Sequence, residues 1–176
     1  MYIWNRKNNH LKHHPNLFLK SEHFISAKLS QDKQNLIYTN KKGSLFLYDL
    51  LQNRYKKIAL SSTKGQFSIA SSFEYEVGNT LLYNEHQLYF FRTKTNSKLI
   101  FETENKINHV YYDAETKIIW VATNHGLIKL IQEDKSIITL KAFFKNNKTV
   151  TSIVQDDKAR LWMCNTTNII YSYGSN

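Results

Sequence analysis

Apolar residues recur along this chain with a period of two, which is the spacing of a β-strand that buries one face. Runs of this kind occupy residues 45–48, 88–91, 150–154 and 169–171. Clusters of Asn, Lys, Gly and Asp separate the runs, as is typical of turns between strands. No long window carries an amphipathic helical stripe. The pattern therefore predicts an all-β chain.

The predicted strands repeat as a unit. Residues 31–50, 112–130 and 156–173 each contain a strand near an Asp, a turn, a strand centred on a large apolar residue, an Asn-containing turn and a further strand, and residues 74–92 form a weaker copy. The central apolar residues are Ile37, Leu82, Trp120 and Trp162, at separations of 45, 38 and 42 residues. Four-stranded propeller blades repeat every ~40–50 residues. We expect these four residues to lie in the core, and Trp162→Ala to cost ~3–5 kcal/mol of stability.

The repeat predicts a β-propeller-type array of about four four-stranded blades in a partial or incomplete ring. The whole chain is then one propeller segment. Its expected parts are the end of a preceding blade (1–20), a blade (21–61), a degenerate blade (62–103), a blade (104–145) and an incomplete blade (146–176). The first and last parts both supply a third strand, so closing the ring would leave one strand duplicated. This favours a segment of a larger propeller over a small closed ring.

Composition narrows the class of protein. Hydrophobic residues reach 41% against 22% charged, which is enough to form a core. The net charge of +10 is compatible with nucleic acid or an anionic membrane as a partner. The lysines are scattered, however, and arginine, the residue best suited to phosphate, occurs only four times. We therefore expect neither nucleic acid nor direct membrane contact, and the N-terminus lacks the apolar stretch of a signal peptide.

No pattern in the sequence supports catalysis. Serine-hydrolase, zinc-protease and phosphate-loop motifs are all missing from it. His10, His13 and His14 suggest metal binding, but adjacent residues of a strand point to opposite faces. We expect no metal and no cofactor, and we expect Asp32, Asp113 and Asp157 to stabilise turns.

The second turn of each repeat is the best candidate for ligand contact. In a propeller, these turns lie at one end of the ring, around the axial funnel. Their Asn, Thr, His and Lys side chains both donate and accept hydrogen bonds, which suits a hydroxyl-rich ligand. Asn is also common in turns for purely local reasons, so both interpretations stay open. The candidate ligand-binding residues are Asn40, Lys41, Asn84, His86, Asn124, His125, Asn165 and Thr166.

The repeats resemble the two-component-regulator propeller repeat. The resemblance rests on residues 150–157 with 160–165, on Asp113 with 119–124 and 126–127, and on Asp32 with 36–40 and Gly43. Asn35 and Ala159 stand where that repeat has a turn glycine. Ala tolerates a left-handed conformation poorly.

The resemblance implies a role in sensing. Such repeats build the periplasmic sensor region of Bacteroides-type hybrid histidine kinases, which commonly respond to carbohydrate breakdown products. It implies a non-catalytic, periplasmic segment that binds a small saccharide and packs against further blades or a second protomer. No kinase motif occurs in this chain. The alternative is a basic interaction module that binds an acidic protein or nucleic acid, and a strong salt dependence of binding would distinguish it.

Overall fold

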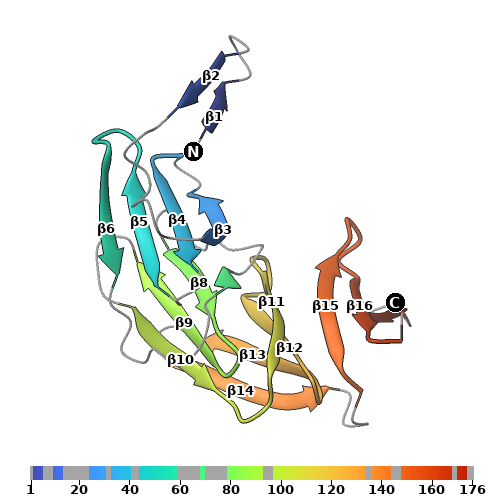
Figure 1. Cartoon of the computed structure of the whole chain (residues 1–176). Helices are drawn as coiled ribbons and strands as arrows, with labels where there is room; N and C mark the ends of the chain where they lie inside the picture. The colour runs from blue at the N-terminus through green and yellow to red at the C-terminus, as the bar shows by residue number, and fades with distance from the viewer. Residues whose placement is uncertain are drawn as a thin grey trace. The chain divides into compact units, whose positions relative to one another are not determined.

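The computed structural model describes residues 2–5, 10–13, 24–30, 33–40, 44–58, 68–69, 79–92, 97–133, 136–143, 148–167 and 170–173. The regular elements among them are all strands, and every strand pairing is antiparallel. The prediction of an all-β chain is confirmed (Figure 1). Two units divide the chain, Met1–Gln66 and Phe67–Asn176.

The first unit contains two sheets. Its strands are β1 (Tyr2–Asn5), β2 (His10–His13), β3 (Phe24–Leu29), β4 (Asn35–Asn40), β5 (Leu45–Asp49) and β6 (Arg54–Ile58). β1 pairs with β2, and the other four form a sheet in the order β3-β4-β5-β6. On that sheet, the ring of Tyr38 stacks on the ring of Phe46 with centroids 5.1 Å apart, and Tyr48 is buried beside them. Cross-strand aromatic pairs of this kind stabilise a sheet and its register.

The second unit contains three sheets, ordered β10-β9-β8-β7, β11-β12-β13-β14 and β15-β16-β17. Their strands are β7 (Ser68–Ile69), β8 (Asn79–Tyr83), β9 (Gln87–Arg92), β10 (Lys98–Glu102), β11 (Ile107–Asp113), β12 (Ile118–Thr123), β13 (Gly126–Glu133), β14 (Ser136–Phe143), β15 (Val150–Gln155), β16 (Leu161–Asn165) and β17 (Ile170–Tyr173). Successive strands pair in sequence, as short connections favour. Each sheet falls within one of the residue ranges expected for a blade.

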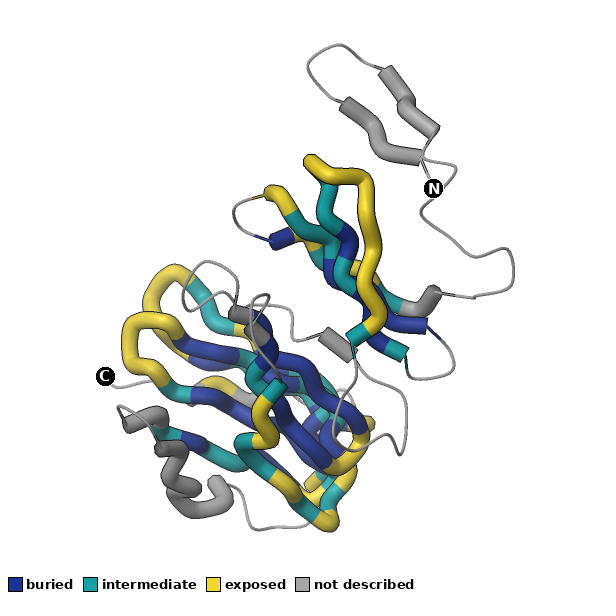
Figure 2. Tube along the Cα trace, turned by 90° about the vertical axis from the view of Figure 1, so that its left-hand side faces the viewer, coloured by how far each residue is buried: buried dark blue, intermediate teal, exposed yellow. Residues whose placement is uncertain are grey.

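The sheets of the second unit pack face to face. Leu81, Tyr83 and Leu88 of the first sheet form one apolar cluster with Val110 and Ile119 of the second. The opposite face of the second sheet is covered by the third sheet, in a cluster described below. Figure 2 shows the buried residues along the middle of these strands and the exposed residues at their turns. The alternation of apolar residues along the strands supplies both faces of the middle sheet.

The cluster between the second and third sheets explains why Trp120 is buried and Trp162 is not. It contains Trp120 on one side and Ile153, Leu161 and Met163 on the other. Trp162 lies between Leu161 and Met163 in the strand, so its side chain points to the opposite face of the third sheet. It is only partly buried. The core prediction therefore needs correction at Trp162, whereas Ile37, Leu82 and Trp120 are 2%, 0% and 3% exposed.

The first turns of the repeats contain residues with positive φ. Lys33, Lys117 and Ala159 have φ of 57°, 56° and 59° in the turns that precede β4, β12 and β16. Asn35 and Ala159 stand where the resembled repeat has a turn glycine. The left-handed conformation occurs at Ala159, but Asn35 already belongs to β4, and Lys33 takes this conformation in its turn.

Replacing Ala159 with glycine is expected to stabilise the chain by about 0.5–1 kcal/mol. The left-handed conformation costs a residue with a Cβ roughly 1–2 kcal/mol, and glycine returns about 0.4–1 kcal/mol of that through the greater entropy of its unfolded chain. Urea denaturation of both proteins measures the difference. Ala114→Gly is the matched control, because Ala114 is an exposed turn residue without a positive φ. It should destabilise instead, and equal effects at both positions would contradict the argument.

Candidate functional site

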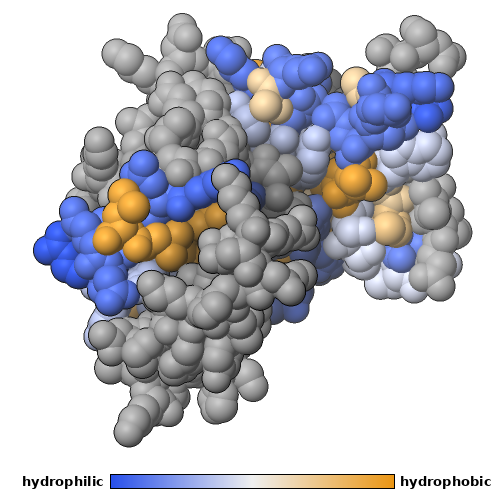
Figure 3. Space-filling view, turned by 90° about the horizontal axis from the view of Figure 1, so that it is seen from above, coloured by the Kyte–Doolittle hydropathy of each residue, from blue (hydrophilic) through white to orange (hydrophobic). Residues whose placement is uncertain are grey.

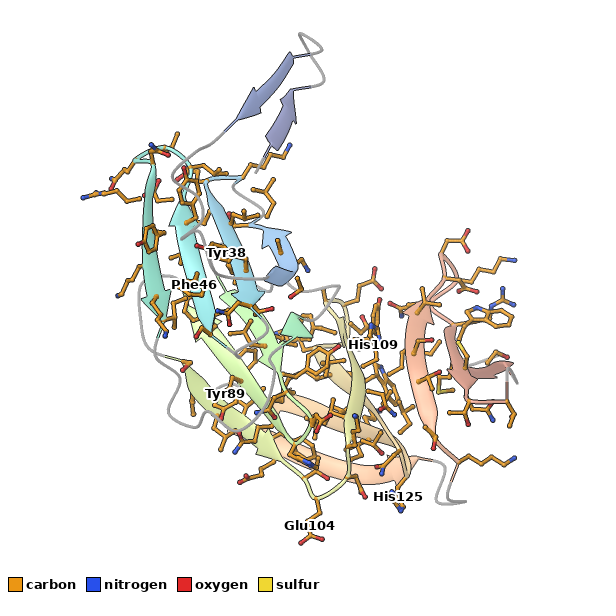
Figure 4. All side chains as sticks on the ribbon, in the orientation of Figure 1. Tyr38, Phe46, Tyr89, Glu104, His109 and His125 are labelled. Carbon is orange, nitrogen blue, oxygen red and sulfur yellow. The ribbon has the colours of Figure 1, made fainter. Side chains whose placement is uncertain are left out.

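The second turns of the three sheets in the second unit lie at one end of the unit, joined by the connections between sheets. The N–H of Ile107 donates to the carbonyl oxygen of Glu85 at 2.7 Å. The N–H of Asn124 donates to the carbonyl oxygen of Lys106 at 3.0 Å, and the Thr149 hydroxyl donates to the Asn124 carbonyl oxygen at 3.1 Å. We call this the turn end. It consists of residues 84–87, 103–106, 124–126, 148–149 and 165–167, and Figure 4 labels Glu104 and His125 on it.

Asn84 organises the first of these turns. Its Oδ1 accepts the N–H groups of His86 and Gln87 at 2.9 and 2.7 Å. The Gln87 side chain accepts hydrogen bonds from Asn84 Nδ2 and the Tyr89 hydroxyl, and it donates to Glu102 Oε1 at 2.8 Å. Asn84 and Gln87 are buried. The Asn84 side chain therefore holds the turn, which is a structural role.

His86 and Glu85 stand exposed beside this network. The His86 ring donates from Nδ1 to the Thr103 carbonyl oxygen at 3.2 Å. Lys106 Nζ lies 2.5 Å from Glu85 Oε1. The hydrogen bond from Lys106, followed by its charge, lowers the pKa of Glu85. Both ends of this ion pair are exposed, so it contributes little to stability, and these side chains remain open to a ligand.

The next turn places His125 and Asn124 differently. His125 is exposed, and its N–H donates to Thr123 Oγ1 at 3.1 Å, while the Thr123 hydroxyl donates to the Gly126 carbonyl oxygen at 2.9 Å. Asn124 Oδ1 is buried and has no hydrogen-bond partner among the described residues. Thr123 thus closes this turn, as Asn84 closes the previous one.

The remaining candidates divide in the same way. Asn165 Oδ1 accepts the N–H and the hydroxyl of Thr167 at 3.0 and 2.8 Å, and Thr166 is exposed. In the first unit, Asn40 Oδ1 accepts the N–H of Ser44 at 2.8 Å. Lys41 lies outside the described residues. The candidates whose side chains are exposed at the turn end are thus His86, His125 and Thr166.

Carboxylates at the opposite end of the strands are engaged in turns. Asp113 accepts the N–H groups of Glu115 and Thr116 and the Thr116 hydroxyl. Burial raises the pKa of Asp113, but these hydrogen bonds together with a bond from Gln155 hold it below its usual value. Asp113 therefore has the structural role predicted for it, and Asp32 lies outside the described residues.

Asp156, rather than the predicted Asp157, stabilises the first turn of the last repeat, between β15 and β16. Its carboxylate accepts from Trp162 Nε1 and Arg160 Nε, both at 2.8 Å, and from the N–H groups of Lys158 and Arg160. The hydrogen bond from Trp162 is the largest of the effects that lower the pKa of Asp156. The Arg160 guanidinium also lies over the Trp162 ring, 5.4 Å from its centroid.

No group of three His, Cys, Asp or Glu side chains in the described ranges is arranged to hold a metal ion. Cys164 is partly buried, and its Sγ lies 2.8 Å from Ser152 Oγ.

Among the residues that the structure describes, there is no helix long and apolar enough to cross a membrane.

Sequence reasoning missed the connections between sheets. Residues 103–106 join two turns that the sequence suggested separately, and Glu85 pairs with Lys106 across them. Glu104 and Asn105 enter the turn end for the same reason. The sequence holds no periodic signal for these contacts, because they depend on how the sheets pack.

Solved structures with the same arrangement are β-propellers. Virginiamycin B lyase from Staphylococcus aureus has a TM-score of 0.68 at 12% identity, over 98% of this chain and 61% of its own. The extracellular domain of the putative hybrid two component system BT4673 from B. thetaiotaomicron has a TM-score of 0.68 at 16% identity, over 99% of this chain and 25% of its own. The corresponding domain of BT3049 from the same organism has a TM-score of 0.67 at 14% identity, over 96% and 23%.

These likenesses define the class of fold. The chain is an array of propeller-type sheets, and it spans less than two thirds of the length of each of these three structures. Two of these structures are extracellular domains of two-component systems, and the repeats of this chain resemble the propeller repeat of such systems. The likeness of the structures is one of fold. No protein-family model matches the sequence, and comparison with curated proteins finds no match either.

Proposed function

We propose that this chain is a non-catalytic sensory segment of a two-component sensor, and that it binds a small saccharide at the turn end of the second unit. The observation that carries the proposal is the meeting of three second turns and two connections at one end. The sensor domains among the structural neighbours support it. One neighbour is named as a lyase, so the fold itself leaves catalysis open. In this setting the segment would be periplasmic.

The chemistry of the turn end suits a polyol. His125 and Thr166 are exposed there and can both donate and accept hydrogen bonds. His86 is also exposed, and because its Nδ1 donates to Thr103, its Nε2 can accept a hydrogen bond from a ligand. The ion pair between Glu85 and Lys106 adds a carboxylate and an ammonium beside them. By contrast, the side-chain oxygens of Asn40, Asn84 and Asn165 accept hydrogen bonds from backbone N–H groups of their own turns. We therefore assign the ligand contacts to the histidines and the threonine.

Calorimetry with a panel of mono- and oligosaccharides tests this assignment. The double variant H86A/H125A is expected to bind the responsive sugar about tenfold more weakly, which corresponds to the loss of about 1.4 kcal/mol of hydrogen bonding. Glu115→Ala, an exposed residue at the opposite end of the strands, is the control and should bind normally. A panel without any binding, or equal affinity in the double variant, would overturn the proposal.

The alternative partner is an acidic macromolecule. Arg54, Lys56 and Lys57 are exposed on β6, the outermost strand of its sheet. Figure 3 shows hydrophilic residues, coloured blue, over much of the described surface on the face that it draws. Basic residues also protect an edge strand from pairing with other chains, so this feature does not require a partner. Binding that weakens steeply with salt would favour the alternative, whereas saccharide binding should be insensitive to salt.

A protein partner is also part of the proposal. Trp162 and Val154 pair across the third sheet on the face opposite to its packed side, and Val154 is 59% exposed. The equivalent Trp120 of the previous sheet is covered by β15 and β16. We propose that a further propeller blade packs on the Trp162 face in the same way.

A further inference from the structure

β15 is an edge strand of the sheet β15-β16-β17, so among the described residues only one side of its backbone pairs with another strand of that sheet. Side chains of β11, in the neighbouring sheet, meet that backbone. Asn108 Nδ2 donates to the Val150 carbonyl oxygen at 2.8 Å. The N–H of Ile153 donates to His109 Nδ1 at 3.2 Å. β11 thus holds β15 through side chains rather than through a strand pairing, and Figure 4 labels His109 on the side of β11 that faces β15.

The bond to Ile153 fixes the protonation state of His109. A ring nitrogen that accepts a hydrogen bond carries no proton, so the imidazole is neutral with its proton on Nε2. A doubly protonated ring has no acceptor and would lose the bond. It would also leave the N–H of Ile153, a buried residue, without this acceptor.

The surroundings of His109 oppose a positive charge. The strands beside it, β12 and β15, contain only uncharged residues. The nearest carboxylate on its own strand, Asp113, is engaged by Thr116 and Gln155, and beyond the end of β15 the charges of Asp156 and Arg160 are paired with each other. Burial lowers the pKa of His109.

We propose that His109 is a proton-sensitive latch, and that its protonation in mildly acidic solution releases β15 from β11 and loosens the sheet β15-β16-β17. The proposal is independent of the saccharide site. An unfolded or released histidine binds its proton near pH 6.5, while the packed form resists protonation. The packed state is therefore fully stable above about pH 6.5 and loses stability as the pH falls below that value.

Two other contacts between β11 and β15 limit the release to one part of this interface. The Tyr111 hydroxyl donates to Gln155 Oε1 at 2.6 Å, and Gln155 Nε2 lies 3.4 Å from Asp113 Oδ2. These bonds join the same two strands near one end and do not involve the imidazole. We expect the strands to separate first around Ile153, while the pairing within each sheet persists.

Hydrogen exchange of the full chain, followed by NMR at pH 7.5 and 5.5, tests the latch. Protection factors, which remove the intrinsic effect of pH, are expected to fall at Ile153. The limit is about tenfold for the pH unit below about 6.5, reached when only the open form binds the proton. Amides of β8 and β9 should keep their protection. In His109→Gln, whose side-chain oxygen can accept the same bond, the pH effect should vanish. His125→Gln, at an exposed turn position, should behave as the wild type.

Two results would overturn the latch. One is an equal loss of protection at Ile153 in His109→Gln. The other is read from the wild type alone, by ¹⁵N shifts of the imidazole, and so does not depend on the folding of any variant. A ring that carries its proton on Nδ1 at neutral pH, or that titrates no lower than histidine in an unstructured peptide, excludes the mechanism.

Discussion

Replacing Trp120 with alanine is expected to lower the free energy of unfolding by about 3–5 kcal/mol. The side chain is 3% exposed and packs between two sheets against Ile153, Leu161 and Met163. Truncation removes a large apolar surface and leaves a cavity that the flanking strands cannot fill. Urea denaturation, monitored by circular dichroism, measures the loss.

Trp162→Ala is the matched comparison, because the two tryptophans occupy equivalent positions of successive repeats. We expect a loss of only about 1–2 kcal/mol, since Trp162 is partly exposed and contributes mainly its bond to Asp156 and its contact with Arg160. This replaces the larger value that the sequence alone predicted. Equal losses in both variants would contradict this prediction, because they would mean that the Trp162 face is already covered within this chain.

Replacing Asn84 with alanine is expected to destabilise the chain by about 2–3 kcal/mol. The variant removes the acceptor of two N–H groups, one of them on the buried residue Gln87, and buried donors that lose their acceptor cost about 1–3 kcal/mol each. The loss is measured by the same denaturation experiment.

Asn165→Ala provides the control for Asn84. It removes the acceptor of the exposed residue Thr167, whose N–H can turn to water, so a loss of about 0.5–1 kcal/mol is expected. The pair also separates the two interpretations of the turn asparagines. An Asn84→Ala protein that melts normally but binds saccharide weakly would make Asn84 a ligand residue, contrary to the role assigned here.

Much of the local structure could be predicted from the sequence. The period of two identifies the strands, because a half-buried strand alternates its faces, and the Asn-containing turns follow from side chains that bond to their own backbone. The repeat at 38–45 residues predicts propeller-type sheets. The sequence prediction was wrong by one residue at the last repeat, where the turn carboxylate is Asp156 rather than Asp157.

The candidate site was predicted only in part. The sequence marked the second turns, but it could not separate exposed candidates such as His125 from turn-forming ones such as Asn84. Both are polar residues in similar positions, and the difference lies in which neighbour each side chain meets. Residues 103–106 lie outside the repeated second turns, although Asn105 donates its N–H to Thr103 Oγ1 in a local turn, and they enter the site only through packing.

The sequence by itself determined the strands, the turns and their grouping into sheets, because these depend on interactions between residues close in the chain. The tertiary structure decided which faces are covered. Trp120 and Trp162 have the same local pattern, but only Trp120 lies beneath a following sheet. The sequence pattern marks His109 only as a residue of a strand. The structure shows that the N–H of Ile153 in β15 donates to its ring. Burial and protonation state depend on neighbours distant in sequence, and local patterns do not record them.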